Sequence, residues 1–169
     1  MEKEKIECEK DKAHYIVATC IIIKEGKYLI AKRSQNEKAF PEKWTVPGGK
    51  LETEDYINRN YDTEKGKQWY NILEDLIKRE VREEVNLEIS SLGYVTSLVF
   101  IRHDNIPTLV ISLFANYSSG EIKLSDELTE YKWVTLEEAK NYDLIDGIYE
   151  ELEILDRHLK SGESMCWKR

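Results

Sequence analysis

Two stretches decide the fold of this chain: WTVPGGKLE at residues 44–52 and REVREEV at residues 79–85. The first places a Gly-Gly turn after a short apolar segment, and the second carries three glutamates on one side of a helix. At about 100° per residue, Glu83 lies about 60° from Glu80 on one side and Glu84 about 40° from it on the other. Like charges at this spacing destabilise a helix, and a divalent cation would remove the repulsion. Oxygen ligands of this kind suit Mg²⁺, with Mn²⁺ as the alternative.

The composition of the whole chain, with 41% hydrophobic and 34% charged residues, is that of one globular domain covering residues 1–169. The net charge of −8, without a basic block, disfavours nucleic acid as a partner, because duplex binding depends on Lys and Arg. The longest apolar run, residues 15–23, is too short to cross a membrane, and the charged residues 1–5 do not resemble a secretory signal. Cys8, Cys20 and Cys166 form no CxxC pair, which favours a cytoplasmic location.

Hydrophobic patterning predicts six strands, separated by one long helix and followed by two helices. The strands are expected at residues 14–23, 28–33, 44–46, 92–102, 108–117 and 130–134. Residues 25–27 form the turn of a first hairpin, and residues 103–107 form the turn of a second. The sequence TLEE at 135–138 has capping-box spacing, and a last helix ends before Gly162. Strands on both sides of one helix predict an α/β (α+β) fold, a mixed sheet between layers of helices.

The long helix is expected over residues 69–85. Its buried stripe recurs every three or four residues and consists of Tyr70, Leu73, Ile77, Val81 and Val85. Asn86 stands where a left-handed residue would end this helix. Residues 56–68 show no periodicity and are interpreted as an inserted loop, and residues 163–169 as a loose tail.

These motifs resemble those of the Nudix hydrolases, whose pattern is G-x5-E-x7-R-E-U-x-E-E-x-G-U with U a bulky apolar residue. Residues 49–55 are similar to its first part and residues 79–87 to its second. Residues 28–34, 44–49 and 130–134 are also similar to Nudix segments and follow in the same order, so the resemblance covers most of the chain. It implies a Nudix-like α/β/α sandwich.

The chain departs from the family pattern in three places. Asp55 and Arg79 are separated by 23 residues where the family has seven, so an insertion splits the motif. The first family glutamate is Asp55 counted from Gly49, but Asn71 counted back from Arg79. The family glycine is Asn86. The insertion precedes the catalytic helix, so trimming residues 56–68 is expected to alter substrate preference more than folding.

The resemblance implies site residues as well as a fold. Glu83 and Glu84 would be the principal metal ligands, with Glu80 and the backbone carbonyl of Gly48 as further ligands. Arg79 would orient the glutamates through an ion pair, with Glu52 as a candidate partner. The general base is Glu84 itself or an acid in the later loop, for which Glu127 and Glu130 are the candidates.

Substrate contacts are expected from Lys32 and Arg33 at the end of a strand, where they can reach phosphates. Phe40, Trp44 and Tyr94 are candidates for stacking on a base. His14, His103 and His158 have no metal-ligand spacing and are interpreted as structural or exposed.

The implied activity is that of a Mg²⁺-dependent pyrophosphohydrolase acting on a nucleotide linked through a diphosphate. A (d)NTP or an oxidised nucleotide is the first expectation. An ADP-ribose or nucleotide-sugar pyrophosphatase is the alternative, as is a non-catalytic nucleotide-binding module. The specific substrate, the number of metals and the formation of a homodimer stay open at this level.

Overall fold

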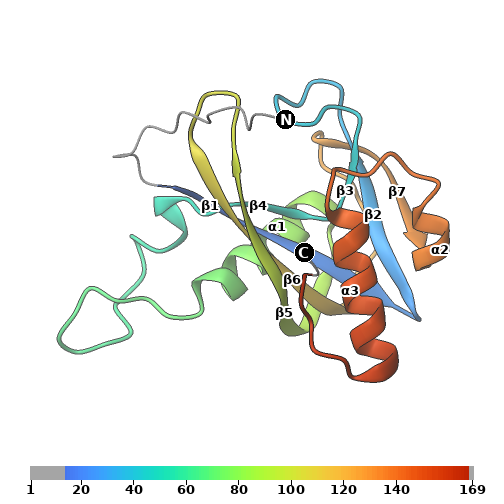
Figure 1. Cartoon of the computed structure of the whole chain (residues 1–169). Coiled ribbons are helices and arrows are strands. Elements are labelled where there is room, and N and C mark those ends of the chain that lie inside the picture. Colours follow the sequence, from blue (N-terminus) through green and yellow to red (C-terminus); the bar gives the residue numbers. More distant parts are fainter. Residues whose placement is uncertain (1–13, 168–169) are drawn as a thin grey trace, which may run out of the picture.

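A computed structural model describes residues 14–167, so Cys8 and residues 1–5 lie outside the described part. Seven strands, three α-helices and one 3₁₀ helix follow one another along the described chain (Figure 1). The strands are β1 (Tyr15–Lys24), β2 (Lys27–Arg33), β3 (Trp44–Thr45), β4 (Gly48–Lys50), β5 (Glu88–Ile101), β6 (Pro107–Ser119) and β7 (Leu128–Val134). The helices are η1 (Thr53–Asp55), α1 (Ile72–Val85), α2 (Leu136–Ala139) and α3 (Ile148–Ser161).

The sheet is mixed and is built around β1. Its order is β3-β2-β1-β6-β5, with β4 also paired to β1 and β7 to β2. β1 runs antiparallel to β2 and parallel to β6. Glu25 and Gly26 join β1 to β2 with positive φ angles of 50° and 73°, as a tight hairpin turn requires.

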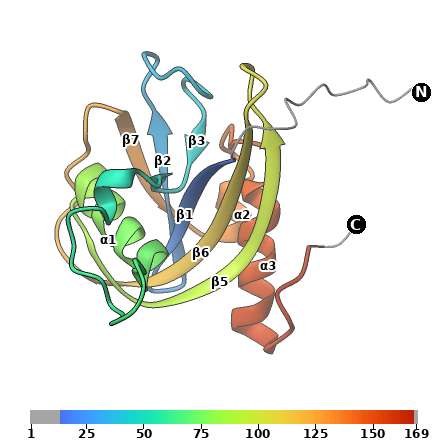
Figure 2. The same cartoon turned by 90° about the vertical axis from the view of Figure 1, so that its left-hand side faces the viewer.

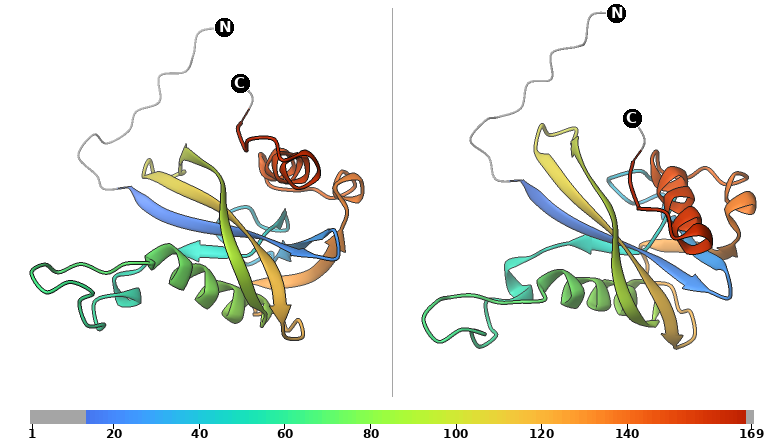
Figure 3. Two further views of the ribbon diagram at one scale, coloured as in Figure 1. Left: turned by 90° about the horizontal axis from the view of Figure 1, so that it is seen from below. Right: turned by 60° about the horizontal axis from the view of Figure 1, so that its bottom comes forward.

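Helices cover both faces of this sheet, α1 on one side and α3 on the other (Figures 2 and 3). Side chains of β1 alternate between the two layers: Ala18 and Cys20 join the cluster under α1, and Ile21 joins the cluster under α3. Alternation of this kind places apolar residues on both faces, as a doubly covered strand needs. The predicted sandwich of helices around a mixed sheet is confirmed.

Helix α1 begins three residues later than its periodicity predicts. Asn71, immediately before it, has a left-handed φ of 56°, which the helix cannot continue through. Tyr70 is therefore outside the buried stripe and is 59% exposed, whereas Ile77, Val81 and Val85 are buried as expected. At the other end, Asn86 has φ 56° and ψ 39°, so the predicted left-handed end of the helix is confirmed.

The observed strand boundaries differ from the predicted ones where a strand pairs with a partner distant in the sequence. Residues 48–50, expected as a turn, form β4 because they pair with Val17 to Thr19 of β1. β5 begins at Glu88, four residues before the expected start, because Glu88 to Ser90 pair with the end of β6. The capping box at Thr135 is confirmed, with reciprocal bonds between Thr135 and Glu138.

The remaining segments have no regular structure. Residues 56–71 form a long loop that projects from the body beside the start of α1 (Figure 1). After Gly162, residues 163–167 contain no helix or strand, and Met165 packs against the cluster under α3. Within residues 14–167, no helix has the length and apolar character needed to cross a membrane.

Candidate active site

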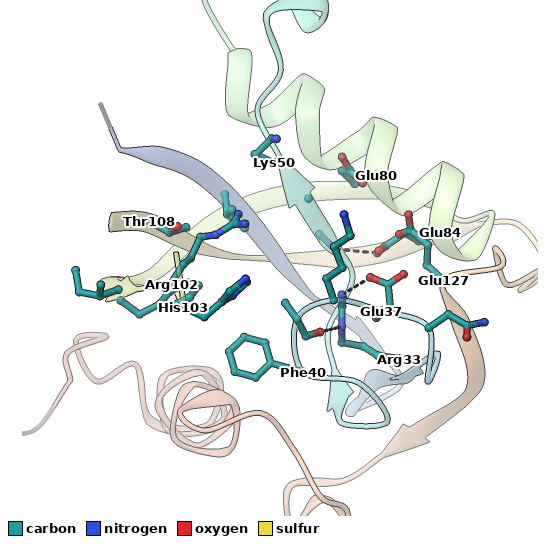
Figure 4. Close-up of a pocket in the computed structure, with 18 residues that line it drawn as sticks. Arg33, Glu37, Phe40, Lys50, Glu80, Glu84, Arg102, His103, Thr108 and Glu127 are labelled. Atoms are coloured by element: carbon teal, nitrogen blue, oxygen red, sulfur yellow. Dashed lines mark hydrogen bonds and ion pairs between the residues drawn. The ribbon is translucent and has the colours of Figure 1, made fainter. Parts of the chain in front are cut away.

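A cavity of about 830 Å³ opens between α1, β4 and the hairpin of β5 and β6 (Figure 4). Its acidic wall consists of Glu80 and Glu84 on α1 and Glu127 in the loop before β7. Cationic side chains line other parts of it: Arg33 from β2, Lys50 from β4, and Arg102 from the turn after β5. The structure thus brings together residues that are up to 94 positions apart in the chain.

Glu84 is the most deeply held of the three acids. It is 6% exposed, and its Oε2 accepts a hydrogen bond of 2.9 Å from the backbone N–H of Gly48. Burial raises the pKa of Glu84 to about 8, and the charges of Glu80 and Glu127 act in the same direction. Gly48 is held by pairing with Thr19 of β1, so the sheet fixes the position of this carboxyl group.

Glu80 lies one helical turn before Glu84 and against the backbone of β4. A Cβ atom at Gly49 would overlap the carboxyl group of Glu80, so any other residue at position 49 would displace this side chain. Burial raises the pKa of Glu80, and the charges of Glu83 and Glu127 add to the shift, while Arg79 opposes it. The Gly-Gly pair of the sequence therefore supplies an N–H to one glutamate and space to the other.

Arg79 holds the acidic side of α1 together. Its Nε donates to Asp55 Oδ1 at 2.8 Å, its Nη2 lies 2.9 Å from Glu80 Oε1, and its Nη1 donates to Glu83 Oε2 at 2.8 Å. The expected partner Glu52 pairs instead with Lys50, at 2.8 Å. The Glu83 side chain is 59% exposed and does not line the cavity, in contrast to Glu80 and Glu84.

The acidic wall has the donor chemistry of a site for a hard divalent cation. Within residues 14–167, no three acidic, His or Cys side chains already stand as a complete ligand group. The carboxyl oxygens are instead engaged by Gly48 and Arg79. Burial and mutual repulsion both disfavour the charged forms of Glu80 and Glu84, and a cation would offset both. The residues present therefore fit a cation such as Mg²⁺.

Of the expected substrate contacts, Arg33 and Phe40 line the cavity and Lys32 does not. Arg33 is fixed by Glu37 at 2.5 Å and by the carbonyl of Ala39 at 2.8 Å. Lys32 instead pairs with Glu130 at 3.4 Å, because the two residues are register partners on β2 and β7. Of the two acids proposed as a base, Glu127 lines the cavity, whereas Glu130 lies on β7 and does not.

The other aromatic candidates lie elsewhere. Trp44 is buried under α3, with its ring 4.8 Å from that of Tyr142. Tyr94 is exposed, and its hydroxyl donates to Ser97. Neither residue lines the cavity, so Phe40 alone of the three is placed to contact a substrate.

Sequence reasoning missed the contribution of the β5–β6 hairpin. Phe100, Arg102, His103 and Thr108 all line the cavity, and Thr108 is paired with Phe100 across the hairpin. The signal available was the alternation of Leu98, Phe100 and Arg102, which places three side chains on one face of a strand. Which face this is could not be known without the partner strand.

No residue of the insertion lines this cavity, so the structure gives no support to its expected role in substrate choice. Its side chains contact one another: the Trp69 ring lies 5.1 Å from that of Tyr56 and 5.2 Å from that of Tyr61. The insertion is tied to the body by the ion pair of Arg59 with Asp75, at 2.8 Å.

Comparison with known proteins agrees with this arrangement. A model of the NUDIX domain matches residues 13–153. The chain is 27% identical to the nucleoside triphosphatase NudI of Salmonella typhimurium over 128 residues, which covers 73% of this chain and 84% of that protein. The crystal structure of the MutT protein from Methanosarcina mazei superimposes with a TM-score of 0.65 at 26% identity, covering 89% and 99% of the two chains.

An ADP-ribose pyrophosphatase from Streptococcus suis has a similar fold, with a TM-score of 0.59 at 17% identity, covering 92% and 97% of the two chains. The family match spans most of the chain and includes both halves of the split motif. This protein belongs to the Nudix hydrolases.

Proposed function

We propose that this hydrolase is a Mg²⁺-dependent pyrophosphohydrolase that cleaves a diphosphate bond in a nucleoside diphosphate-linked substrate. The observation that carries the proposal is the cavity itself, which the acidic wall of Glu80, Glu84 and Glu127 shares with cationic side chains such as Arg33, Lys50 and Arg102. Such a cavity suits a polyphosphate, whose charge needs both a metal and cations. A (d)NTP or an oxidised nucleotide is the first choice, supported by the similarity to a nucleoside triphosphatase.

The residues divide into three roles. Glu80 and Glu84 would hold the cation, with Glu83 and the carbonyl of Gly48 as further ligands from the same helix and turn. When bound, the cation neutralises phosphate charge and makes a water molecule more acidic. Arg79 is a positioning residue, because it holds both Glu80 and Glu83.

Binding of the phosphates falls to the cationic side chains. Arg33 is pre-oriented by Glu37, so its guanidinium is held at the edge of the cavity before a substrate arrives. Lys50 and Arg102 both stack on the ring of Tyr15, 4.8 Å from its centroid, which restrains them on the opposite side. A diphosphate between these groups lies across the acidic wall.

Cleavage requires a base that takes the proton of the attacking water. The water oxygen forms a bond to phosphorus, the bridging P–O bond breaks, and two phosphate products leave. Glu127 is our choice for the base, because it faces Glu80 and Glu84 without a described hydrogen-bond partner that fixes its carboxyl group. Glu84 is the alternative.

The proposal is tested by a Mg²⁺-dependent hydrolysis screen that covers nucleoside triphosphates, oxidised dNTPs, ADP-ribose and nucleotide sugars. Glu84→Gln keeps an oxygen for the N–H of Gly48 but removes the charge, so we expect a loss of turnover of more than about 100-fold. Glu74→Gln, at an exposed position of the same helix, is the matched control and should retain full turnover.

Each outcome of the screen has a clear meaning. Cleavage of ADP-ribose or a nucleotide sugar in preference to triphosphates would replace the first choice of substrate by the alternative. Cleavage of no compound by the wild-type protein, or equal cleavage by Glu84→Gln, would refute the proposal. If no compound is cleaved, a nucleotide-binding module without turnover would be the better description.

A further inference from the structure

A second cavity of about 330 Å³ lies between the sheet and the start of α3. Its walls are mainly apolar and include Leu98 of β5, Val110 of β6 and Ile148 of α3. It adjoins the acidic cavity, because Phe40 and Glu84 line both. A ligand that fills the apolar space can therefore place a polar group at the acidic wall.

A second buried carboxyl group, besides that of Glu84, lines this apolar space. Glu151 of α3 is 4% exposed, and its Oε2 accepts a hydrogen bond of 2.6 Å from the hydroxyl of Ser112. Ser112 is fully buried and does not line the cavity. The bond therefore anchors one carboxyl oxygen in the protein and leaves Oε1 as the oxygen available to a ligand.

The buried surroundings of Glu151 disfavour the charged form of its carboxyl group. Burial raises the pKa of Glu151, and the nearby charge of Glu150 adds to this shift, while the bond from Ser112 opposes it. A carboxyl group taken out of water is unfavourable unless its hydrogen bonds are satisfied. The cluster packed around the same face of α3 is otherwise formed by apolar side chains such as Leu152 and Leu155.

We propose that the second cavity binds the heterocyclic base of the nucleotide, and that Glu151 determines which base is accepted by hydrogen bonding to its edge. This inference rests on the proposed function. Phe40 and Phe100, with ring centroids 6.2 Å apart, stand at the passage that the base and the phosphates share. Asp146, which also lines this cavity, is exposed and is not anchored as Glu151 is.

The hydrogen bond between Glu151 and Ser112 would make the cavity selective among nucleotide bases. A carboxyl group held by one oxygen presents its second oxygen in a fixed direction, and a base edge either offers a matching group or leaves it unpaired. A site built to hydrogen bond discriminates strongly against ligands that lack the matching group, because its own polar group then stays buried without a partner. Apolar walls alone give weak discrimination.

The test measures dissociation constants by calorimetry for the four nucleoside 5′-monophosphates and for ribose 5-phosphate, which has no base. Glu151→Met keeps the length of the side chain and removes its hydrogen bonds. We expect the tightest of the four monophosphates to bind about tenfold more weakly, and the four constants to converge to within about threefold. Ribose 5-phosphate should change by less than about twofold. Glu153→Gln, at an exposed position of the same helix outside the cavity lining, should leave the ranking unchanged.

Ser112→Ala is the second variant, which decides the matter if Glu151→Met does not fold. This variant removes the hydrogen bond that holds the carboxyl group of Glu151. It should narrow the differences in dissociation constant between the four monophosphates and leave the dissociation constant of ribose 5-phosphate unchanged. An unchanged ranking of the bases in both variants, or equal weakening of every ligand, would overturn the inference and leave Glu151 a structural residue. Base-selective binding without hydrolysis would instead refute the proposed function and retain the inference.

Discussion

At the scale of single residues, the ion pair between Asp55 and Arg79 explains how a split motif still builds one site. Arg79 Nε and Nη2 reach the two carboxyl oxygens of Asp55 at 2.8 and 3.3 Å, across the whole insertion. Asp55 also accepts the backbone N–H of Glu52 within the 3₁₀ turn, so its carboxyl group is held from two sides. The insertion therefore begins directly after Asp55 and ends before the helix that carries Arg79, so this ion pair joins the chain on its two sides.

We predict that Asp55 and Arg79 act as one unit. Asp55→Asn should weaken the hold on Arg79 and lower kcat about tenfold. Arg79→Lys should lower kcat at least as much, because an ammonium group cannot contact Asp55, Glu80 and Glu83 together. The double variant should be little worse than Arg79→Lys alone, as a double-mutant cycle on kcat would measure. Strictly additive losses would mean that the two side chains act independently.

Local spacing made part of the site predictable, and non-local pairing hid the rest. The positions of Glu80 and Glu84 follow from helix geometry, which needs only neighbouring residues. The pairing of Lys32 with Glu130 depends on β2 and β7 meeting, although 98 residues separate the two side chains. The same holds for Glu151, whose cavity arises where elements distant in the sequence meet.

At the scale of elements, most strands and helices could be predicted because their apolar patterns are local. The errors lie where a backbone angle or a partner strand decides. The left-handed conformation of Asn71 prevents helix α1 from extending back to Tyr70. Strand β4 exists only because β1 lies beside it. The insertion had no apolar period, and it packs through aromatic side chains of its own.

We predict that the tip of the insertion can be removed without effect on specificity. The N–H of Asp62 donates to the carbonyl of Gln68 at 2.9 Å, so the chain ends left by deleting residues 63–67 are adjacent and a two-residue Gly turn can join them. We expect the melting temperature to change by less than about 4 °C, which is about 1 kcal/mol for a chain of this length. The ratios of kcat/KM between substrates should be unchanged. A change in these ratios would restore the insertion as a substrate-contacting element.

At the scale of the whole molecule, the sheet separates two layers with different roles. The layer of α1 carries the acidic wall, and the layer of α3 closes the apolar cavity. Both cavities meet at Glu84, which lies under β4. A nucleotide can therefore reach from one layer to the other along the sheet, with its phosphates at α1 and its base at α3.

The layer of α3 should also make stability depend on pH through Glu151. The pKa of Glu151 is raised in the folded protein, mainly by burial, so the folded state binds its proton more tightly than the unfolded chain does. The contribution of this group to stability is then fully present below the unfolded pKa of about 4.3 and is lost as pH rises through the folded value. Glu151→Gln has no such titration and keeps an oxygen for Ser112.

Unfolding by urea between pH 4 and pH 8, followed by circular dichroism, measures this effect. The midpoint of Glu151→Gln should rise relative to that of the wild-type protein as pH increases, with the smallest difference near pH 4. Comparison at each pH cancels the contributions of Glu80 and Glu84, which both proteins share. Glu153→Gln, at an exposed position of the same helix, is the control and should show no such trend. A constant difference across the range would mean that Glu151 titrates alike in the folded and unfolded chains, and that burial between α3 and the sheet does not disfavour its charge.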